Sequence, residues 1–152
     1  MSPGESAPYC GGSIVTRSHV LTTAHCVVNI NTGNVKDPGS MQVLVGAHDT
    51  NVSNVDRRDI STIRTHPQYS NSQGKYDAAV LFLSSALTFT SSVAPVCLPG
   101  SIRSMYTGQA ATVTGWGLTG ASGDSSPTLQ EVEVTVASNE ECSDIYPGKI
   151  KE

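Results

Sequence analysis

Short apolar runs separated by polar turn segments make up most of the chain. The first two, Gly12–Thr16 and His19–Ala24, are separated only by Arg17-Ser18, a spacing that predicts a β-hairpin. The remaining candidate strands are Met41–Gly46, Asp59–His66, Ala78–Leu83, Gln109–Trp116 and Leu129–Ala137. Strands this short and this closely spaced predict an all-β fold, either a barrel or a sandwich.

Other segments refine this pattern. The uninterrupted apolar run Ala78–Leu83 is typical of a strand buried on both faces. Leu118–Pro127 is rich in Gly and Ser and predicts a loop. Two short helices are expected, one turn around Ala24–Val27 and another that begins after the possible cap Ser138 or Asn139.

Length and charge narrow the function classes. A chain of 152 residues suits one domain or a piece of one. The formal net charge of -4 argues against nucleic acid as a partner, because neutralising phosphates needs a basic face. No apolar run approaches the roughly 20 residues that a membrane span needs. The first residues have neither the basic region nor the apolar core of a signal peptide.

The four cysteines indicate an oxidising compartment. Cys10, Cys26, Cys97 and Cys142 allow three pairings if all are bridged. None of their spacings is the close pair typical of structural zinc sites, so no metal is expected. Together with the low-charge, Ser/Thr/Gly-rich composition, they favour a disulfide framework in an extracellular protein.

His25 is the histidine with a distinctive setting. It follows an apolar strand directly and precedes Cys26, whereas His19, His48 and His66 fit ordinary surface or core roles. A histidine that moves protons needs a carboxylate to fix its tautomer. Asp77 is the candidate, because an ionised carboxylate beside the apolar run 78–83 is costly unless it is hydrogen-bonded or paired.

The motifs around these residues, taken in order, resemble the trypsin/chymotrypsin-like serine proteases. The matching segments are Cys10–Ile14, Val20–Cys26, Tyr76–Leu81, Ala94–Pro99, Thr114–Gly117 and Leu129–Val132, with Cys142 beyond them. The resemblance covers roughly residues 7–146. It implies a secreted endopeptidase that acts on proteins or peptides without a cofactor.

The resemblance also implies a fold and residue roles. The fold would be a double β-barrel, here a partial domain over 1–152. Residues 7–108 would form most of the first barrel, without its first strand, and 109–152 the start of the second. His25 would be the general base and acid, Asp77 its orienting carboxylate, and Cys10–Cys26 a disulfide beside the histidine.

The chain departs from the family at its nucleophile. The family's serine stands in Gly-Asp-Ser-Gly-Gly, and this sequence lacks that motif. The nearest string, Gly123-Asp124-Ser125, continues with Ser126-Pro127, so we expect Ser125 to be a solvated loop residue. Cys97 and Cys142 would pair outside these residues, Cys97 with a propeptide or light chain. The chain alone is therefore expected to be inactive.

Two other interpretations stay open. The chain could derive from a non-catalytic relative that binds or regulates, although retention of both His25 and Asp77 weighs against this. It could also be a truncated isoform. Asn51-Val52-Ser53 is an N-glycosylation sequon on an expected loop.

Overall fold

The computed structural model describes residues 8–52, 55–100, 106–121 and 124–148. These residues form two compact units, unit 1 as far as Leu98 and unit 2 from Pro99 onward. None of the described helices is long and apolar enough to cross a membrane.

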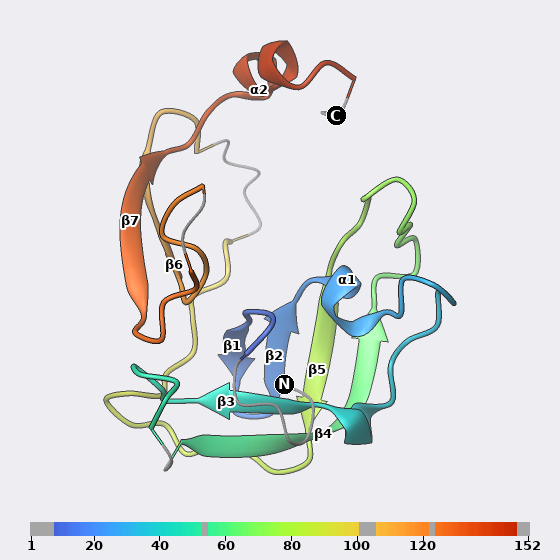
Figure 1. Cartoon of the computed structure of the whole chain (residues 1–152), viewed down its shortest axis with the longest axis vertical. Helices are drawn as coiled ribbons and strands as arrows, with labels where there is room; N and C mark the ends of the chain where they lie inside the picture. Colours follow the sequence, from blue (N-terminus) through green and yellow to red (C-terminus); the bar gives the residue numbers. More distant parts are fainter. Residues whose placement is uncertain (1–7, 53–54, 101–105, 122–123, 149–152) are drawn as a thin grey trace. The chain divides into compact units, whose positions relative to one another are not determined.

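Unit 1 is built on one antiparallel five-stranded sheet (Figure 1). Its strands are β1 (Ser13–Thr16), β2 (His19–Thr22), β3 (Gln42–Val45), β4 (Asp56–Thr65) and β5 (Ala79–Leu83). The order across the sheet is β1-β2-β5-β4-β3. β1 and β2 form the expected hairpin, in which Ile14 pairs with Val20.

The long strand β4 serves two partners. Its residues 56–59 pair with β3, and its residues from Ile60 onward pair with β5. The register of β4 against β5 shifts between Ile60 and Thr62, and β4 is visibly bent in Figure 1. Such an irregularity lets one strand turn a corner, so the sheet curves around a core in place of lying flat.

That core consists of buried apolar side chains from α1 (Ala24–Val27) and from strands β2 to β5, together with Met41 and Leu87. Leu87 and Val27 are the largest fully buried side chains among the described residues. The inward positions of β5, which are Ala79, Leu81 and Leu83, pack with them. Gly12 allows β1 to approach closely, since a Cβ there would lie 2.9 Å from Val20 Cγ1 and 3.1 Å from the Leu21 carbonyl oxygen.

Two short helical turns complete unit 1. α1 (Ala24–Val27) follows β2 after Thr23, as expected. η1 (Pro38–Ser40) was not expected, because the residues before β3 were interpreted as a polar loop. Its start is an Asp-Pro signal, in which the Asp37 side chain accepts a hydrogen bond from the Gly39 N–H at 3.1 Å.

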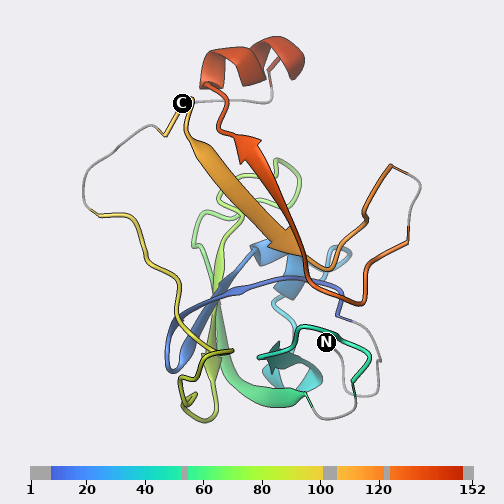
Figure 2. The same ribbon diagram turned by 90° about the vertical axis from the view of Figure 1, so that its left-hand side faces the viewer.

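Unit 2 is a β-hairpin followed by a helix (Figure 2). β6 (Ala110–Gly115) pairs with β7 (Gln130–Thr135), with Val113 opposite Val132. α2 (Asn139–Ile145) begins with a capping box: the Ser138 hydroxyl accepts from the Glu141 N–H, and the Glu141 carboxylate accepts from the Ser138 N–H.

The sequence pattern locates all these strands to within a few residues at each end. One expectation was wrong: β5 is not buried on both faces. Val80 and Phe82 on its outer face are half-buried, unlike the inward residues. Part of that face is left open by a hollow of about 220 Å³ that Leu21, Arg64 and Val80 help to line, and Phe82 meets the ring of His19 in the neighbouring strand β2.

Candidate active site

His25 and Asp77 come together because of the pairing of β2 with β5. Thr22, the last residue of β2, pairs with Ala79, the first residue of β5. The strands are antiparallel, so the chain leaving β2 and the chain entering β5 lie at the same edge of the sheet. His25, in the first turn after β2, and Asp77, just before β5, are therefore neighbours despite 52 positions of separation.

Two hydrogen bonds join these residues. Nδ1 of His25 lies 2.6 Å from Oδ2 of Asp77, and the backbone N–H of His25 donates to Oδ1 at 2.8 Å. Because an ionised carboxylate only accepts, Nδ1 carries a proton and donates it, which leaves Nε2 with its lone pair in the neutral ring. The His25 side chain is 57% exposed and that of Asp77 is 28% exposed, so a reactant can reach the imidazole.

The surroundings of Asp77 favour its ionised form. Burial pushes the pKa of Asp77 upward, but hydrogen bonds from the His25 ring and from the backbone N–H groups of His25 and Ala24 outweigh it. The net result is an Asp77 pKa below its ordinary value. At neutral pH the carboxylate is therefore charged and able to orient the imidazole.

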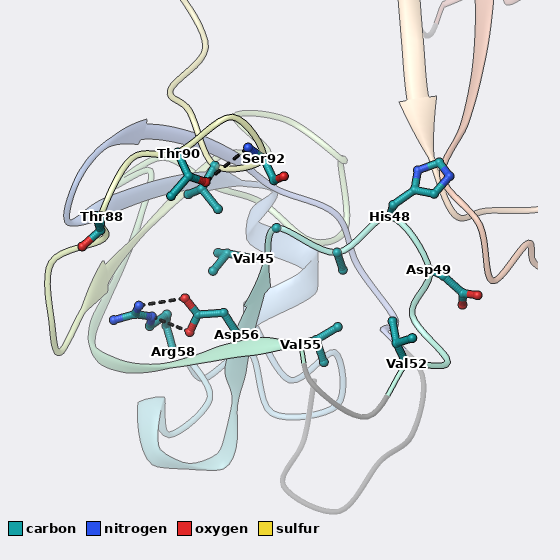
Figure 3. A pocket seen from close by; sticks show the side chains of 13 residues that line it. Val45, His48, Asp49, Val52, Val55, Asp56, Arg58, Thr88, Thr90 and Ser92 are labelled. Carbon is teal, nitrogen blue, oxygen red and sulfur yellow. Dashed lines mark hydrogen bonds and ion pairs between the residues drawn. The ribbon is translucent and has the colours of Figure 1, made fainter.

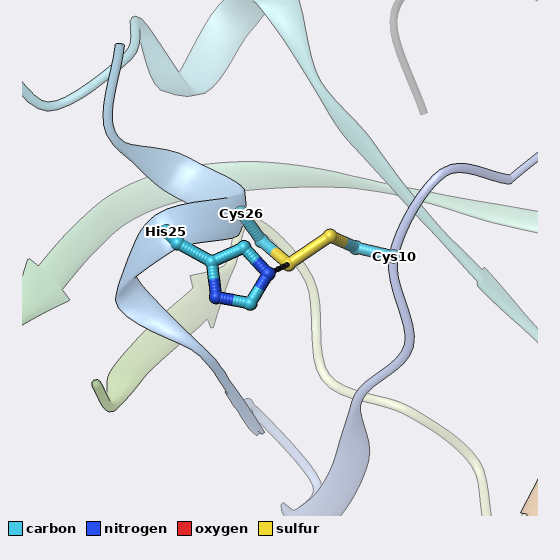
Figure 4. A group of neighbouring side chains, drawn as sticks. All are labelled: Cys10, His25 and Cys26. Atoms are coloured by element: carbon cyan, nitrogen blue, oxygen red, sulfur yellow. Dashed lines mark hydrogen bonds between the residues drawn. A yellow bond between two sulfur atoms is a disulfide. The ribbon is translucent and has the colours of Figure 1, made fainter. Parts of the chain in front are cut away.

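A disulfide stands beside the histidine (Figure 4). Cys10, ahead of β1, is bonded to Cys26 of α1, and their Cα atoms are 6.2 Å apart. Nε2 of His25 lies 3.6 Å from Cys26 Sγ. Although potential ligand atoms of Cys10, His25 and Cys26 cluster within 4.8 Å, sulfurs bonded to each other are not thiolate ligands, so the cluster offers a metal only the imidazole.

The sequence matches the Trypsin family over residues 2–152. The chain belongs to the trypsin family of serine proteases. It is 34% identical over 149 residues to Trypsin-1 of Astacus astacus, covering 94% of this chain and 59% of that protein. It is 32% identical over 156 residues to a venom serine protease of Polistes dominula, covering 98% of this chain and 53% of that protein.

A solved structure shows the same fold. Neuropsin, a serine protease expressed in the limbic system of mouse brain, matches with a TM-score of 0.80 and 28% sequence identity. The match covers 97% of this chain and 62% of that one. The expected trypsin-like double β-barrel class is thereby confirmed. This chain spans about three fifths or less of the length of these relatives.

The family is one of serine proteases, enzymes that hydrolyse peptide bonds. His25 and Asp77 are the two residues to which the family resemblance gives catalytic roles, and both lie in unit 1. Ser125 lies in unit 2, where it is exposed and forms an isolated β-bridge with Leu118.

The remaining residues of interest occupy the surface. Asn51 is an exposed turn residue whose backbone N–H donates to Asp49 at 2.8 Å, and Ser53 of its sequon falls outside the described residues. Cys97 is an exposed free thiol, and Cys142, in α2, is a half-buried one.

A hollow of about 530 Å³ opens at another place in this trypsin-family unit (Figure 3). Valines, including Val45, and the hydroxyl residues Thr88, Thr90 and Ser92 line it. Asp56 and Arg58 face each other at its wall, 2.7 Å apart. Neither His25 nor Asp77 lines this hollow, so we assign it no part in the candidate site.

One neighbour of Asp77 was missed by sequence analysis. Burial raises the pKa of Tyr69, and the charge of the nearby Asp77 carboxylate raises it further. The Tyr69 hydroxyl is therefore neutral at neutral pH, and it donates a hydrogen bond to Oδ1 of Asn71 at 3.2 Å. No periodicity or motif distinguishes Tyr69 in the sequence, because it lies in an irregular connection between β4 and β5.

Proposed function

We propose that these residues carry the proton-transfer half of a secreted serine endopeptidase, with His25 as general base and acid and Asp77 as its orienting carboxylate. The observation that supports this is the pair of hydrogen bonds from the His25 ring and backbone to the two oxygens of Asp77. That arrangement fixes the ring, its tautomer and the direction of its Nε2 lone pair.

In the proposed reaction, a serine hydroxyl attacks the carbonyl carbon of a peptide bond. Nε2 of His25 takes the hydroxyl proton as the C–O bond forms, and Asp77 stabilises the resulting imidazolium without being protonated itself. The imidazolium then gives the proton to the leaving amine, and an acyl-enzyme is left for water to hydrolyse by the reverse sequence.

The nucleophile in this proposal is supplied by residues outside these 152. The family's Gly-Asp-Ser-Gly-Gly motif does not occur in the sequence, and Ser125 is followed by a proline two positions later. We accordingly propose that residues 7–108 belong to the first barrel and 109–152 to the start of the second. The 152-residue chain alone does not hydrolyse peptides.

The remaining assignments follow from the same proposal. The exposed thiol of Cys97 is available for a disulfide to a propeptide or light chain, and Cys142 for a partner in the rest of the protease domain. Asn51, on an exposed turn, is the proposed glycosylation site of a secreted product.

A fluorophosphonate probe, which labels activated serines, tests this proposal. The purified chain is expected to remain unlabelled, whereas the chain extended by its natural downstream sequence is expected to be labelled at a serine in that extension. In the extended protein Asp77→Asn should lower kcat by about 10⁴-fold, as loss of the triad aspartate does in this family. His19→Ala is the control, since His19 bonds to Thr16 and not to the site.

Two outcomes would contradict the proposal. Stoichiometric labelling of Ser125 in the 152-residue chain, abolished by His25→Ala, would make the loop serine the nucleophile. A downstream sequence with glycine in place of the motif serine would indicate a non-catalytic relative.

A further inference from the structure

Asp77 is held in an unusual length of backbone. Among the described residues, Tyr76 is the one residue other than glycine with a positive φ, at 53°. The Ala78 N–H donates to the Tyr76 carbonyl oxygen at 2.8 Å, closing a three-residue turn with Asp77 at its centre. A bulky side chain in the left-handed region is unfavourable and persists only where the surroundings fix it.

His66 contacts the residues on both sides of Asp77 and so holds the turn in place. Its backbone N–H donates to the Ala78 carbonyl oxygen at 2.8 Å, which anchors the residue after Asp77. Its ring stacks on the Tyr76 ring, which anchors the residue before, with centroids 4.8 Å apart and planes 8° from parallel. His66, just after β4, therefore holds the two neighbours of Asp77 in the chain.

The His66 ring is itself held in place. Its Nδ1 accepts the backbone N–H of Gln68 at 3.1 Å, and its carbonyl oxygen accepts the N–H of Tyr69 at 3.0 Å. The turn at 66–69 thus fixes the ring that Tyr76 stacks on. Tyr76 is 52% exposed, so burial in the core does not explain why its ring lies there.

We propose that His66 and Tyr76 form a positioning pair that holds the strained turn at Asp77 and thereby aims its carboxylate at Nδ1 of His25. This inference deepens the proposed function and rests on it for its catalytic meaning. Neither ring touches the reacting atoms in this scheme; both act through the backbone on either side of Asp77. The stack offsets the conformational cost of tyrosine at a positive φ.

The test is spectroscopic and needs no turnover. In the 152-residue chain with ¹⁵N-labelled histidine, the Nδ1–H proton shared with Asp77 should give a resolved downfield resonance, and ¹³C shifts report the titration of the Asp77 carboxyl. Tyr76→Ala and His66→Ala should each move that resonance upfield and raise the pKa of Asp77 toward its ordinary value. The Ala78 amide should exchange roughly 3- to 10-fold faster, matching the loss of one aromatic pair.

Two variants act as controls. Tyr76→Phe keeps the stacked ring and should retain the wild-type resonance, titration and exchange rate. His19→Ala removes a ring contact of similar length, in which the centroids of His19 and Phe82 are 4.6 Å apart. It should also leave the resonance, the Asp77 titration and the Ala78 exchange rate unchanged. A purely structural role for the stack would lower the urea midpoint without moving the resonance.

The outcomes are separable. The proposal is overturned if Tyr76→Ala and His66→Ala leave the resonance and the Asp77 titration as in wild type, or if His19→Ala shifts them equally. Absence of the downfield resonance from the wild-type chain would instead contradict the His25–Asp77 hydrogen bond, which is the basis of the proposed function.

Discussion

The two units of the chain use similar strands in different ways. In unit 1 Val20 of β2, Ile60 of β4 and Leu81 of β5 are each exposed to 6% or less. In unit 2, none of the described residues between 99 and 148 is buried, and β7 is exposed along its whole length. Yet β6 and β7 have one apolar and one polar face, with Val113, Val132 and Val134 on the apolar side.

This contrast shows that alternation alone does not make a core. Five strands that curve around Leu87 and Val27 remove apolar surface from water on one side of a sheet. The described β6–β7 ribbon has the same pattern, but its valines stay exposed, and two-stranded ribbons are marginally stable by themselves. The described part of unit 2 therefore depends on local hydrogen bonds, and unit 1 on packing.

The largest expected difference comes from deleting buried atoms. Leu87→Ala should lower the free energy of unfolding of unit 1 by about 2–5 kcal/mol, because Leu87 is 2% exposed and its loss leaves a cavity. The matched change Val132→Ala in unit 2, at a side chain 56% exposed, should cost about 0.5 kcal/mol or less. Hydrogen exchange with mass spectrometry in increasing urea resolves the two units; equal losses would contradict the comparison.

Removing the disulfide should have the next largest effect, again in unit 1 alone. The double change Cys10→Ser/Cys26→Ser opens a loop between residues 16 positions apart and should lower the stability of unit 1 by about 3 kcal/mol. Cys97→Ser/Cys142→Ser is the control and should change neither unit, since both thiols are free. The same exchange measurement applies, and protection lost from β6 and β7 in the first variant would show coupling that we do not expect.

Acidification should give the smallest effect and act on both units for different reasons. The folded-state pKa of Asp77 is lowered, so its contribution to stability is complete above the unfolded value near 3.9 and is lost as the pH falls through the folded pKa. Asp77→Asn should remove this part of the pH dependence from unit 1. Urea midpoints from resolved NMR signals between pH 2 and 7 measure it; an unchanged slope in the variant would mean that another group causes the dependence.

Glu141 provides the counterpart in unit 2. Hydrogen bonds from the Ser138 backbone N–H and hydroxyl lower the pKa of Glu141, so α2 should lose helix as the pH falls through the folded-state pKa of Glu141. Ser138→Ala should remove that dependence without altering the midpoint of unit 1. The two carboxyl groups differ in reach: Glu141 is three positions from its partner, whereas Asp77 is 52 positions from His25.

That difference in reach also explains what the sequence could predict. Strand β7 follows from the alternation of Val132 and Val134 with Glu131 and Glu133, and the start of α2 from the cap candidates Ser138 and Asn139, because these signals act between near neighbours. The bend of β4 at Ile60 leaves no such mark, since it arises from pairing with two different strands.

The candidate site divides in the same way. The residues themselves indicated Asp77 as the candidate carboxylate for His25, and the resemblance to a known family then gave each residue its role. The positive φ of Tyr76 was not predictable, because tyrosine has no preference for that conformation and the stacking partner His66 lies in a different segment, just after the end of β4.

The pairing of β2 with β5 also sets the order in which the molecule can assemble. β1 and β2 are joined by a tight turn and can meet within microseconds, as hairpins do. The β2–β5 ladder must first close a loop that includes η1, β3 and β4, so it is expected late in folding. We therefore expect His25 and Asp77 to meet only near the end of folding. Their hydrogen bonds then stabilise a strand arrangement that the packing of the apolar strands has already formed.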